Sequence, residues 1–245
     1  MIKEIEKYKI ETNKEHNNGG TLYLINNFLY KYYGSVNYFI EEKERNINFL
    51  MENPIPNTPH IIEKLTENGE FCGYIMEYID DSKTLRQGMK ENLPEESKLS
   101  IIADIYQALK RIHDLGACLG DIHMDNFIYQ GDRGFIIDLD EIRFPGDEFK
   151  FRECYLIRES KGSMVSKKAT RNTDNIKLAI CCLSFLYQFD FEEIIMKESL
   201  QEVKEQLRDI IPLPQYESIE KIFDLNNLYY LDDIICSPNL HRGKS

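Results

Sequence analysis

The most informative part of the sequence runs from residue 116 to residue 140 and reads GACLGDIHMDNFIYQGDRGFIIDLD. It contains two short apolar runs, 127–129 and 135–137, and the five residues between them suit the turn of a small hairpin. Carboxylate and amide side chains flank the predicted hairpin on both sides: Asp121 and Asn126 before it, Asp138 and Asp140 after it.

A long helix is predicted directly before this stretch. Pro94-Glu95-Glu96 opens a run whose apolar residues recur at spacings of three and four, and Gly116 stands where a C-terminal cap is expected. The recurring residues are Leu99, Ile102, Ile105, Tyr106, Leu109 and Ile112. Another apolar helix is predicted over 175–189, and further helices over 192–210 and 217–225, so the second half of the chain is expected to be mainly helical.

The first half of the chain is typical of an antiparallel sheet. Residues 5–11 and 21–33 carry aromatic and β-branched side chains, and Asn26-Asn27 interrupts the second segment as a two-residue hairpin turn should. Residues 71–79 predict another strand. Residues 36–51 predict one helix, because apolar residues recur at helical spacings along a charged segment and two prolines follow it.

A polar turn, Asp80-Asp81-Ser82-Lys83, separates the two halves. We therefore expect an α+β protein of two parts: residues 1–79, a sheet with one helix, and residues 80–245, mainly helical. A chain of 245 residues is long for one compact core and short for two independent domains. Two lobes that share a cleft are the expected arrangement.

Composition and charge narrow the classes of partner. With 42% hydrophobic and 29% charged residues, the chain is too apolar for a disordered protein. Its formal net charge of -12 repels phosphate backbones and anionic membranes, so we expect neither nucleic acid nor a membrane as partner. No apolar run approaches the roughly 20 residues of a membrane span, and residues 1–6 lack the apolar core of a signal peptide. A cytoplasmic protein is expected.

The six cysteines contain no C-x-x-C pair. Cys181 and Cys182 are adjacent and lie in the apolar helix predicted over 175–189. This pattern favours structural thiols in a reducing compartment.

The polar residues around the hairpin are spaced in a way that resembles protein-kinase-like phosphotransferases. In that family the catalytic loop reads Asp, four residues, Asn, and a second Asp follows one hairpin later at the magnesium site. Here Asn126 comes five residues after Asp121, and Asp138 comes twelve residues after Asn126. The resemblance covers roughly residues 5–190 and implies the bilobal kinase-like fold, with ATP and Mg²⁺ as cofactors.

The resemblance also implies a role for each of these residues. A transferring phosphoryl group carries dense negative charge, so Asn126, Asp138 and Asp140 are expected to hold Mg²⁺. The acceptor hydroxyl must lose its proton, and Asp121 is expected to accept it. Taken singly, an Asp or Asn in such a loop is more often a turn former or a cap, and only their conjunction favours catalysis.

In the first half of the chain, Lys31 matches the family's lysine that contacts the α- and β-phosphates of ATP. An exposed strand lysine is the alternative. The partner of Lys31 is expected to be a helix glutamate, for which Glu44 fits best because apolar residues follow it at three and six positions. Glu41 and Glu42 stay open as alternatives.

The remaining nucleotide contacts are expected from two places. Gly19 and Gly20 stand where the family has three spaced glycines, and they would lay backbone amides over a phosphate while Leu22 packs on the adenine. The strand at 71–79 resembles the one that leads into the interlobe hinge. The residues expected there are Met76 at the back of the pocket, and the backbone of Glu77 and Ile79 at the adenine edge.

A further match lies downstream at Thr173-Asp174. It resembles the opening of a family helix in which a buried Asp hydrogen-bonds the backbone of the catalytic loop, so Asp174 would hold that loop rigid. Capping of the helix by Thr173 or Asp174 is the alternative, and both can hold together. His113, at the end of the helix before the loop, is expected to be structural.

The acceptor is open between two classes. Leu119-Gly120-Asp121 replaces the His-Arg-Asp of eukaryotic protein kinases, so the arginine that binds a phosphorylated activation loop is missing. Gly120-Asp121-Ile-His123 instead resembles the catalytic loop of aminoglycoside and choline phosphotransferases. We expect a protein Ser/Thr acceptor, because the segment between Asp138 and Asp174 is compact and of protein-kinase length. A small-molecule acceptor is the alternative.

Three other features bear on activity. Asp138-Leu139-Asp140 replaces Asp-Phe-Gly, and without the glycine the segment is less free to flip, so a constitutively formed site is expected. The basic segment Lys161–Arg171 is interpreted as a solvated loop or as a site for an acidic acceptor. The reduced glycine loop leaves a pseudokinase as an alternative, and nucleotidyl transfer on the same fold is another.

Overall fold

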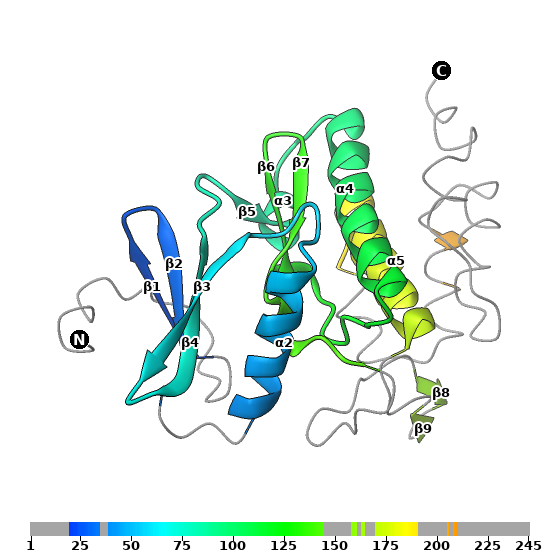
Figure 1. Ribbon diagram of the computed structural model, residues 1–245. Coiled ribbons are helices and arrows are strands. Elements are labelled where there is room, and N and C mark those ends of the chain that lie inside the picture. Colours follow the sequence, from blue (N-terminus) through cyan, green and yellow to red (C-terminus); the bar gives the residue numbers. More distant parts are fainter. Residues whose placement is uncertain are drawn as a thin grey trace.

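The computed structural model describes residues 20–34, 39–144, 158–160, 163–164, 170–190, 205 and 208–209. Within them the chain is α+β: a four-stranded antiparallel sheet with one helix beside it stands next to a part with two long helices and a small sheet (Figure 1). No helix of these ranges is both long and apolar enough to cross a membrane. The predictions for residues 5–11, Gly19, 217–225 and most of 161–171 and 192–210 lie outside the described residues.

The sheet begins with the hairpin that the sequence predicts. β1 (Thr21–Ile25) pairs antiparallel with β2 (Phe28–Tyr32), and Asn26 and Asn27 form the turn with φ of 52° and 65°. Asparagine tolerates this left-handed conformation because its short side chain can hydrogen-bond locally. The turn sets the register, which places Lys31 opposite Leu22.

Two further strands complete the sheet in the order β1-β2-β4-β3. β4 (Glu70–Glu77) is the strand predicted at 71–79, whereas β3 (Ile61–Glu67) is missing from the prediction. β3 pairs with β4 through two register shifts, which disturb the alternation of apolar and polar residues that identifies a strand. Its turn, Asn68-Gly69 with φ of 54° and 86°, is the sequence signal that would have found it.

Gly73 allows β4 to approach β2 beside Lys31. A Cβ atom on Gly73 would lie 2.1 Å from the backbone oxygen of Lys31. We expect Gly73→Ala to push the strands apart and to lower the free energy of unfolding by about 1–3 kcal/mol, the usual cost of overpacking, as measured by urea denaturation. Glu70→Ala, at an exposed position of the same strand, is the control and should change it by less than about 0.5 kcal/mol. Equal stability of the two variants would contradict the close approach.

Helix α2 (Ile40–Glu52) packs against β3 and β4. It ends at Asn53, whose N–H donates to the backbone oxygen of Phe49, and Pro54 follows. The buried residues of α2 are spaced as one helical face: Lys43, Asn46, Ile47 and Leu50. Two of these four are polar, so this face brings an ammonium group and an amide toward the interior.

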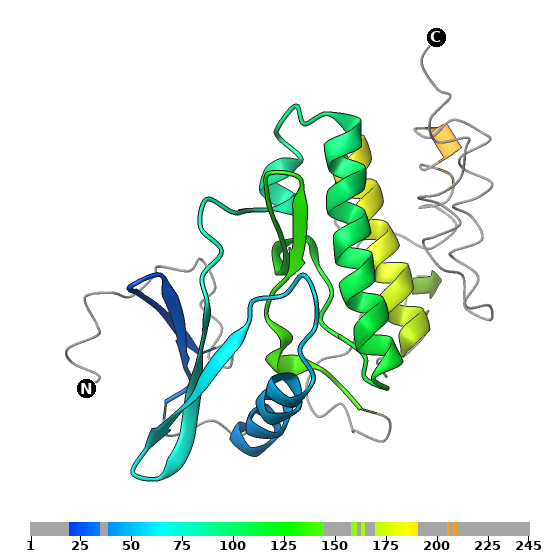
Figure 2. The same ribbon diagram turned by 45° about the horizontal axis from the view of Figure 1, so that its top comes forward.

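Helices α4 (Glu95–Asp114) and α5 (Arg171–Tyr187) lie side by side (Figures 1 and 2). α4 ends at Asp114, and Gly116, with φ of 85°, completes its C-terminal cap as predicted. The N–H groups of Gly116 and Ala117 donate to backbone oxygens of the last turn and close the helix with a Schellman motif. The chain therefore turns away from α4 directly before Asp121.

The start of α5 corrects the sequence-based prediction. The helix begins at Arg171, four residues before the predicted start, because Thr170 and Thr173 form a capping box. Thr170 is the N-cap residue, and the side chain of Thr173 accepts from the N–H of Thr170 at 2.8 Å, so the prediction that Thr173 takes part in capping is confirmed. Asp174 lies inside the first turn and is free to serve the loop after α4.

The predicted hairpin is formed by β6 (Phe127–Gln130) and β7 (Arg133–Ile136), and β7 packs on α4. A short strand, β5 (Lys83–Thr84), pairs with β6 and leads into the one-turn helix α3 (Leu85–Gly88). Because Phe127 lies opposite Ile136, the residues before β6 and after β7 lie next to each other. Farther along, β8 (Arg158–Ser160) pairs with β9 (Ser163–Met164).

Two connections fasten the sheet to the helical part. In the loop between α2 and β3, the backbone oxygen of Asn57 accepts from the N–H of Ile136 at 3.0 Å, and its side chain donates to the backbone oxygen of Asp104 at 3.2 Å. Between β4 and β5, the backbone oxygen of Asp80 accepts from Nε2 of Gln130 at 3.0 Å. Each connection thus bonds to the β6–β7 hairpin, and the first also bonds to α4.

The described cysteines have the character of structural thiols. Cys72, Cys181 and Cys182 are buried, and none of the four cysteines in the described ranges forms a disulfide. Burial, and the nearby carboxylate of Asp174, raise the pKa of the Cys118 thiol to about 12. Cys118 is therefore protonated and unreactive near neutral pH.

Candidate functional site

A buried carboxylate from α5 holds the loop between α4 and β6. Asp174 accepts hydrogen bonds from the N–H groups of Leu119 and Gly120, at 2.6 Å and 3.0 Å, and its Oδ2 lies 3.0 Å from Nε2 of the buried His113. Only 1% of the Asp174 side chain is exposed. These contacts confirm that Asp174 bonds to the backbone next to Asp121. The buried His113 contacts the same carboxylate, as a structural role would require.

Asn126 ties this loop to the segment after β7. It ends the short 3₁₀ helix η2 (Met124–Asn126), and its Nδ2 donates to the backbone oxygen of Asp121 at 3.0 Å. Its own backbone oxygen accepts from the N–H of Ile137 at 2.9 Å. Asn126 thus links the backbone of Asp121 with that of Ile137, the residue that precedes Asp138.

Asp138 follows β7 in a left-handed backbone conformation with φ of 65°, which Asp tolerates better than most residues. Its carboxylate forms an ion pair with Lys31, and 32% of its side chain is exposed. Its pKa is raised to about 6, because burial raises it by more than the attraction of Lys31 lowers it, and Asp140 raises it further. Solvent therefore reaches part of a carboxylate that protein atoms otherwise surround.

Asp140 lies in the 3₁₀ helix η3 (Leu139–Glu141), and its side chain is fully buried. Its Oδ1 accepts from Nζ of Lys31 at 2.7 Å, and its Oδ2 accepts from Nζ of Lys43 at 2.7 Å and from the hydroxyl of Tyr33. Burial alone would raise the pKa of this carboxyl, but the two ammonium groups hold it well below its usual range. Protein donors contact both oxygens of Asp140, and its predicted role as a Mg²⁺ ligand stays a prediction.

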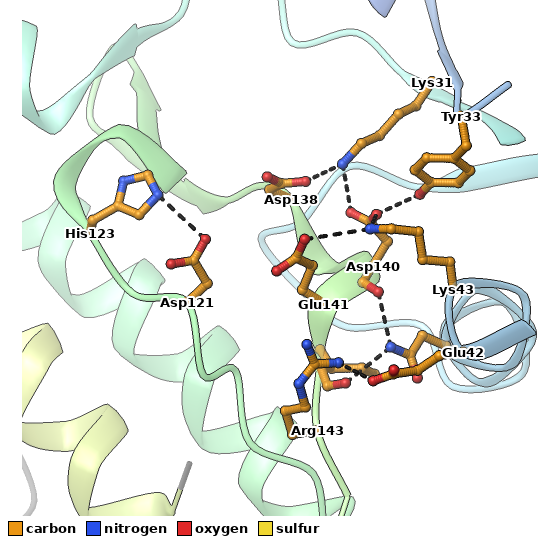
Figure 3. Close-up of polar contacts among 12 residues, drawn as sticks. Lys31, Tyr33, Glu42, Lys43, Asp121, His123, Asp138, Asp140, Glu141 and Arg143 are labelled. Carbon is orange, nitrogen blue, oxygen red and sulfur yellow. Dashed lines mark hydrogen bonds and ion pairs between the residues drawn. The ribbon is translucent and has the colours of Figure 1, made fainter. Parts of the chain in front are cut away.

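Lys31 points from β2 toward Asp138 and Asp140 (Figure 3). Only 5% of Lys31 is exposed, which rules out the alternative of an exposed strand lysine. Burial disfavours the charged ammonium, yet the pKa of Lys31 is raised well above its ordinary value because the attraction of the two carboxylates together is larger. Lys31 is therefore a buried, charged group at the junction of the two parts.

Glu44 does not pair with Lys31, so this prediction is wrong. Its carboxylate lies 2.8 Å from Nζ of Lys64 on β3, and the alternative, Glu42, contacts Arg143 (Figure 3). The buried face of α2 holds Lys43 in place of Glu44, a rotation of about 100° about the helix axis. Residues 43 and 44 both lie about one turn before Ile47, so the spacing alone could not distinguish them.

Three residues of this cluster are absent from the predicted site: Tyr33, Lys43 and Asn46. Tyr33 comes two residues after Lys31, as expected for a side chain on the same side of a strand. Nδ2 of Asn46 donates to the backbone oxygens of Asp140 and Ile142, at 2.9 Å and 3.0 Å. The signal that would have found Lys43 and Asn46 is the presence of polar residues on the apolar face of a helix.

The carboxylate of Asp121 lies beside His123, apart from the cluster around Asp140 (Figure 3). Nε2 of His123 is 3.7 Å from Oδ2 of Asp121, and its Nδ1 is 3.9 Å from Oδ2 of Asp125. Arg86 on α3 donates to Asp125 at 3.1 Å and to Asp190 at 2.7 Å. Asp121 is partly exposed, with 28% of its side chain accessible to solvent.

The predicted nucleotide-side residues of the sheet lie around Lys31. Leu22 is opposite it on β1 and is half-buried, and Met76 is buried on the neighbouring β4. Gly20 is exposed with φ of 77°, and a Cβ atom there would lie 2.9 Å from the backbone oxygen of Tyr32. This position therefore requires glycine.

The connection after β4 carries the two residues predicted at the adenine edge. The N–H of Glu77 donates to the backbone oxygen of His60 at 2.9 Å, and the backbone oxygen of Ile79 accepts from Oγ of Ser82 at 2.8 Å. The side chain of Ile79 packs with Ile128 and Phe135. The groups that the prediction needs, the oxygen of Glu77 and the N–H of Ile79, are different from the ones used in these two hydrogen bonds.

The predicted metal ligands supply only part of a coordination shell. Among the described residues, no three His, Cys, Asp or Glu side chains are grouped so as to hold a metal ion by themselves. The predicted ligands that fit are Asn126 and Asp138. One amide oxygen and one carboxylate suit Mg²⁺, which commonly takes one or two carboxylates from the protein and completes its shell with water and phosphate oxygens.

Neither the models of known protein families nor the curated proteins include a match to this sequence. The function is therefore inferred from the geometry and chemistry of the site alone.

Proposed function

We propose that the protein is an ATP- and Mg²⁺-dependent phosphotransferase that acts on a hydroxyl and has a bilobal protein-kinase-like fold. The observation that supports this most directly is the ion pair between Lys31 and Asp138, which lie 107 residues apart. Asn126 connects the segment of Asp138 to Asp121 through two hydrogen bonds. A cation for phosphates, a metal-binding pair and a carboxylate base would thus serve one reaction.

Asn126 and Asp138 are the residues that would hold Mg²⁺. Because Nδ2 of Asn126 donates to the backbone oxygen of Asp121, its Oδ1 is directed away from that contact. The carboxylate of Asp138 is partly exposed. Bound Mg²⁺ would neutralise charge on the phosphate oxygens during transfer. Asp140 contributes in this proposal by holding Lys31.

Lys31 and Asp121 have separate tasks in this proposal. Lys31 would orient the α- and β-phosphates with its buried positive charge. Asp121 would accept the proton of the acceptor hydroxyl as the oxygen attacks the γ-phosphorus. The hydrogen bonds of Asn126 and Asp174 to the loop backbone would keep the Asp121 carboxylate in one place.

The acceptor that we propose first is a protein serine or threonine, on the length of the segment between Asp138 and Asp174. A second candidate is a small-molecule hydroxyl, which is favoured by the contact between His123 and Asp121 in the Gly-Asp-x-His arrangement. A screen of peptide and metabolite acceptors, with products identified by mass spectrometry, distinguishes the two. A product carrying a nucleotide would indicate nucleotidyl transfer, and ATP binding without any product would indicate a pseudokinase.

Replacement of Lys31 by methionine should weaken binding of Mg·ATP about tenfold to a hundredfold, since hydrogen bonds to charged groups contribute about 1.5–3 kcal/mol. Isothermal titration calorimetry measures the change. Lys64→Met is the matched control, because it removes the same charge from a partly exposed ion pair outside the site. The side chains of that pair, Lys64 and Glu44, are 31% and 39% exposed.

The same titration in excess chelator tests the metal. ATP should then bind the wild-type protein more weakly, because Asp121 and Asp138 concentrate negative charge near the triphosphate. Equal affinity with Mg²⁺ and with chelator, together with wild-type affinity of Lys31→Met, would contradict the proposed site.

A further inference from the structure

We propose that Lys43 is a positioning residue of this site: acting through Asp140, it determines where the ammonium group of Lys31 lies and how much of its charge is available. For its effect on nucleotide binding, the proposal rests on the phosphotransferase function proposed above. The contacts that support it are independent of any ligand.

Two buried ammonium groups share one buried carboxylate. Lys31 and Lys43 are 5% and 4% exposed, and Asp140 is 1% exposed. Each ammonium nitrogen lies 2.7 Å from a different oxygen of the Asp140 carboxylate. Asp138 is a second partner of Lys31, and Glu141 is a second partner of Lys43 at 3.5 Å, but both of these carboxylates are partly exposed. Asp140 is the one fully buried carboxylate that the two lysines share, and a buried charge without a partner is strongly unfavourable.

The Asp140 carboxylate is held from two sides. Lys31 approaches it from β2, and Lys43 approaches it from α2 on the opposite oxygen, where the hydroxyl of Tyr33 also donates. Asn46, one helical turn after Lys43, donates to the backbone oxygens of Asp140 and Ile142. Helix α2 therefore holds both the side chain and the main chain of the turn that follows Asp138.

The two carboxylate partners of Lys31, Asp138 and Asp140, differ in exposure. Asp140 is fully buried and held from both sides, whereas Asp138 is 32% exposed. If Asp138 turns toward a metal ion, Asp140 still holds the ammonium group in place. Asp140 is thus the buried partner of Lys31, the role predicted for Glu44. Its other oxygen accepts from Lys43 of α2.

Lys31 and Lys43 share the negative charge of Asp140. Lys43 neutralises part of the Asp140 carboxylate, so Asp140 does not fully neutralise Lys31. Without Lys43, the carboxylate would serve Lys31 alone and would leave less positive charge for a phosphate. The turn after Asp138 would also lose one of its two anchors on α2.

The test is a double-mutant cycle with calorimetry of Mg·ATP. Lys43→Met should weaken binding about tenfold in the wild-type background and less than about twofold in the Asp140→Asn background, because coupled residues are not additive. Lys64→Met, an equal change of charge outside the cluster, should bind like the wild type. Additive effects of Lys43→Met and Asp140→Asn would show that Lys43 does not act through Asp140, and would overturn the proposal.

A second readout needs no nucleotide. Hydrogen exchange of the amides of residues 138–142 should be about tenfold faster in Lys43→Met than in the wild type, and unchanged in Lys64→Met. If the wild type fails to bind Mg·ATP, the proposed function fails, and the exchange data in the same four backgrounds still decide the role of Lys43. Wild-type exchange in Lys43→Met would overturn it.

Tyr33→Phe covers the case in which Lys43→Met does not fold. It removes the hydroxyl, which contacts Asp140 and also hydrogen-bonds with Tyr74, and it keeps the ring that packs near Phe71 and Tyr74. The same two changes should appear with smaller size and should vanish in the Asp140→Asn background. Wild-type affinity and exchange in Tyr33→Phe would overturn the proposal in that case.

Discussion

Asp121→Asn is expected to slow phosphoryl transfer by about a hundredfold to ten-thousandfold, the usual contribution of a general base. The amide keeps the size and reach of the carboxylate but cannot accept the proton of the acceptor. The loop itself should stay in place, because Asn126 and Asp174 hold its backbone oxygen and N–H groups. Initial rates with labelled ATP and an identified acceptor measure the loss, and calorimetry should show nearly unchanged Mg·ATP affinity.

Asp125→Asn is the matched control for this substitution. Asp125 lies in the same loop, but its carboxylate pairs with Arg86 at 3.1 Å, so most of the activity should remain. Asp138→Asn should look different from both, because loss of a charged ligand weakens metal-dependent binding as well as transfer. Full activity in Asp121→Asn would remove the proposed base and leave the fold with some other chemistry.

Asp174→Ala is expected to lower the free energy of unfolding by roughly 2–6 kcal/mol, because it leaves two buried N–H groups without acceptors at about 1–3 kcal/mol each. These are the N–H groups of Leu119 and Gly120. Urea denaturation measures the loss. Transfer activity should fall at the same time under conditions where the variant is still folded, since the loop that presents Asp121 is no longer held.

Asp132→Ala is the control for Asp174→Ala. Asp132 is an exposed residue in the turn between β6 and β7, so its removal should change stability by less than about 0.5 kcal/mol. If the two variants unfolded at the same urea concentration, the loop after α4 would not depend on Asp174.

The second half of the site could be predicted because its parts are close in sequence. Asp121, Asn126 and Asp138 fall within eighteen residues, and one hairpin with a short turn determines how they meet. The C-terminal cap of α4 at Gly116 follows from local backbone chemistry in the same way. The contact of Asp174 with the loop is long-range, and the resemblance to kinase-like sequences was needed to predict it.

The partners of Lys31 could not be predicted because no local spacing relates residue 31 to residues 138 and 140. The helix in between was expected to supply a glutamate, and a phase error of one residue exchanged Glu44 for Lys43. β3 was missed for a related reason: its pairing with β4 shifts register twice, so the sequence lacks a regular alternation. In each case tertiary contacts decide what a short pattern leaves open.

The two fastenings of the sheet, at Asn57 and at Asp80, limit how the molecule can open. A rotation of the sheet over the helices would leave both fastenings intact only if it pivoted near the line that joins them. The ion pairs of Lys31 belong to neither fastening, so such a rotation stretches them. In the proposed phosphotransferase, opening of this kind would separate opposite charges, and the buried carboxylate of Asp140, which contacts two ammonium groups, would oppose it.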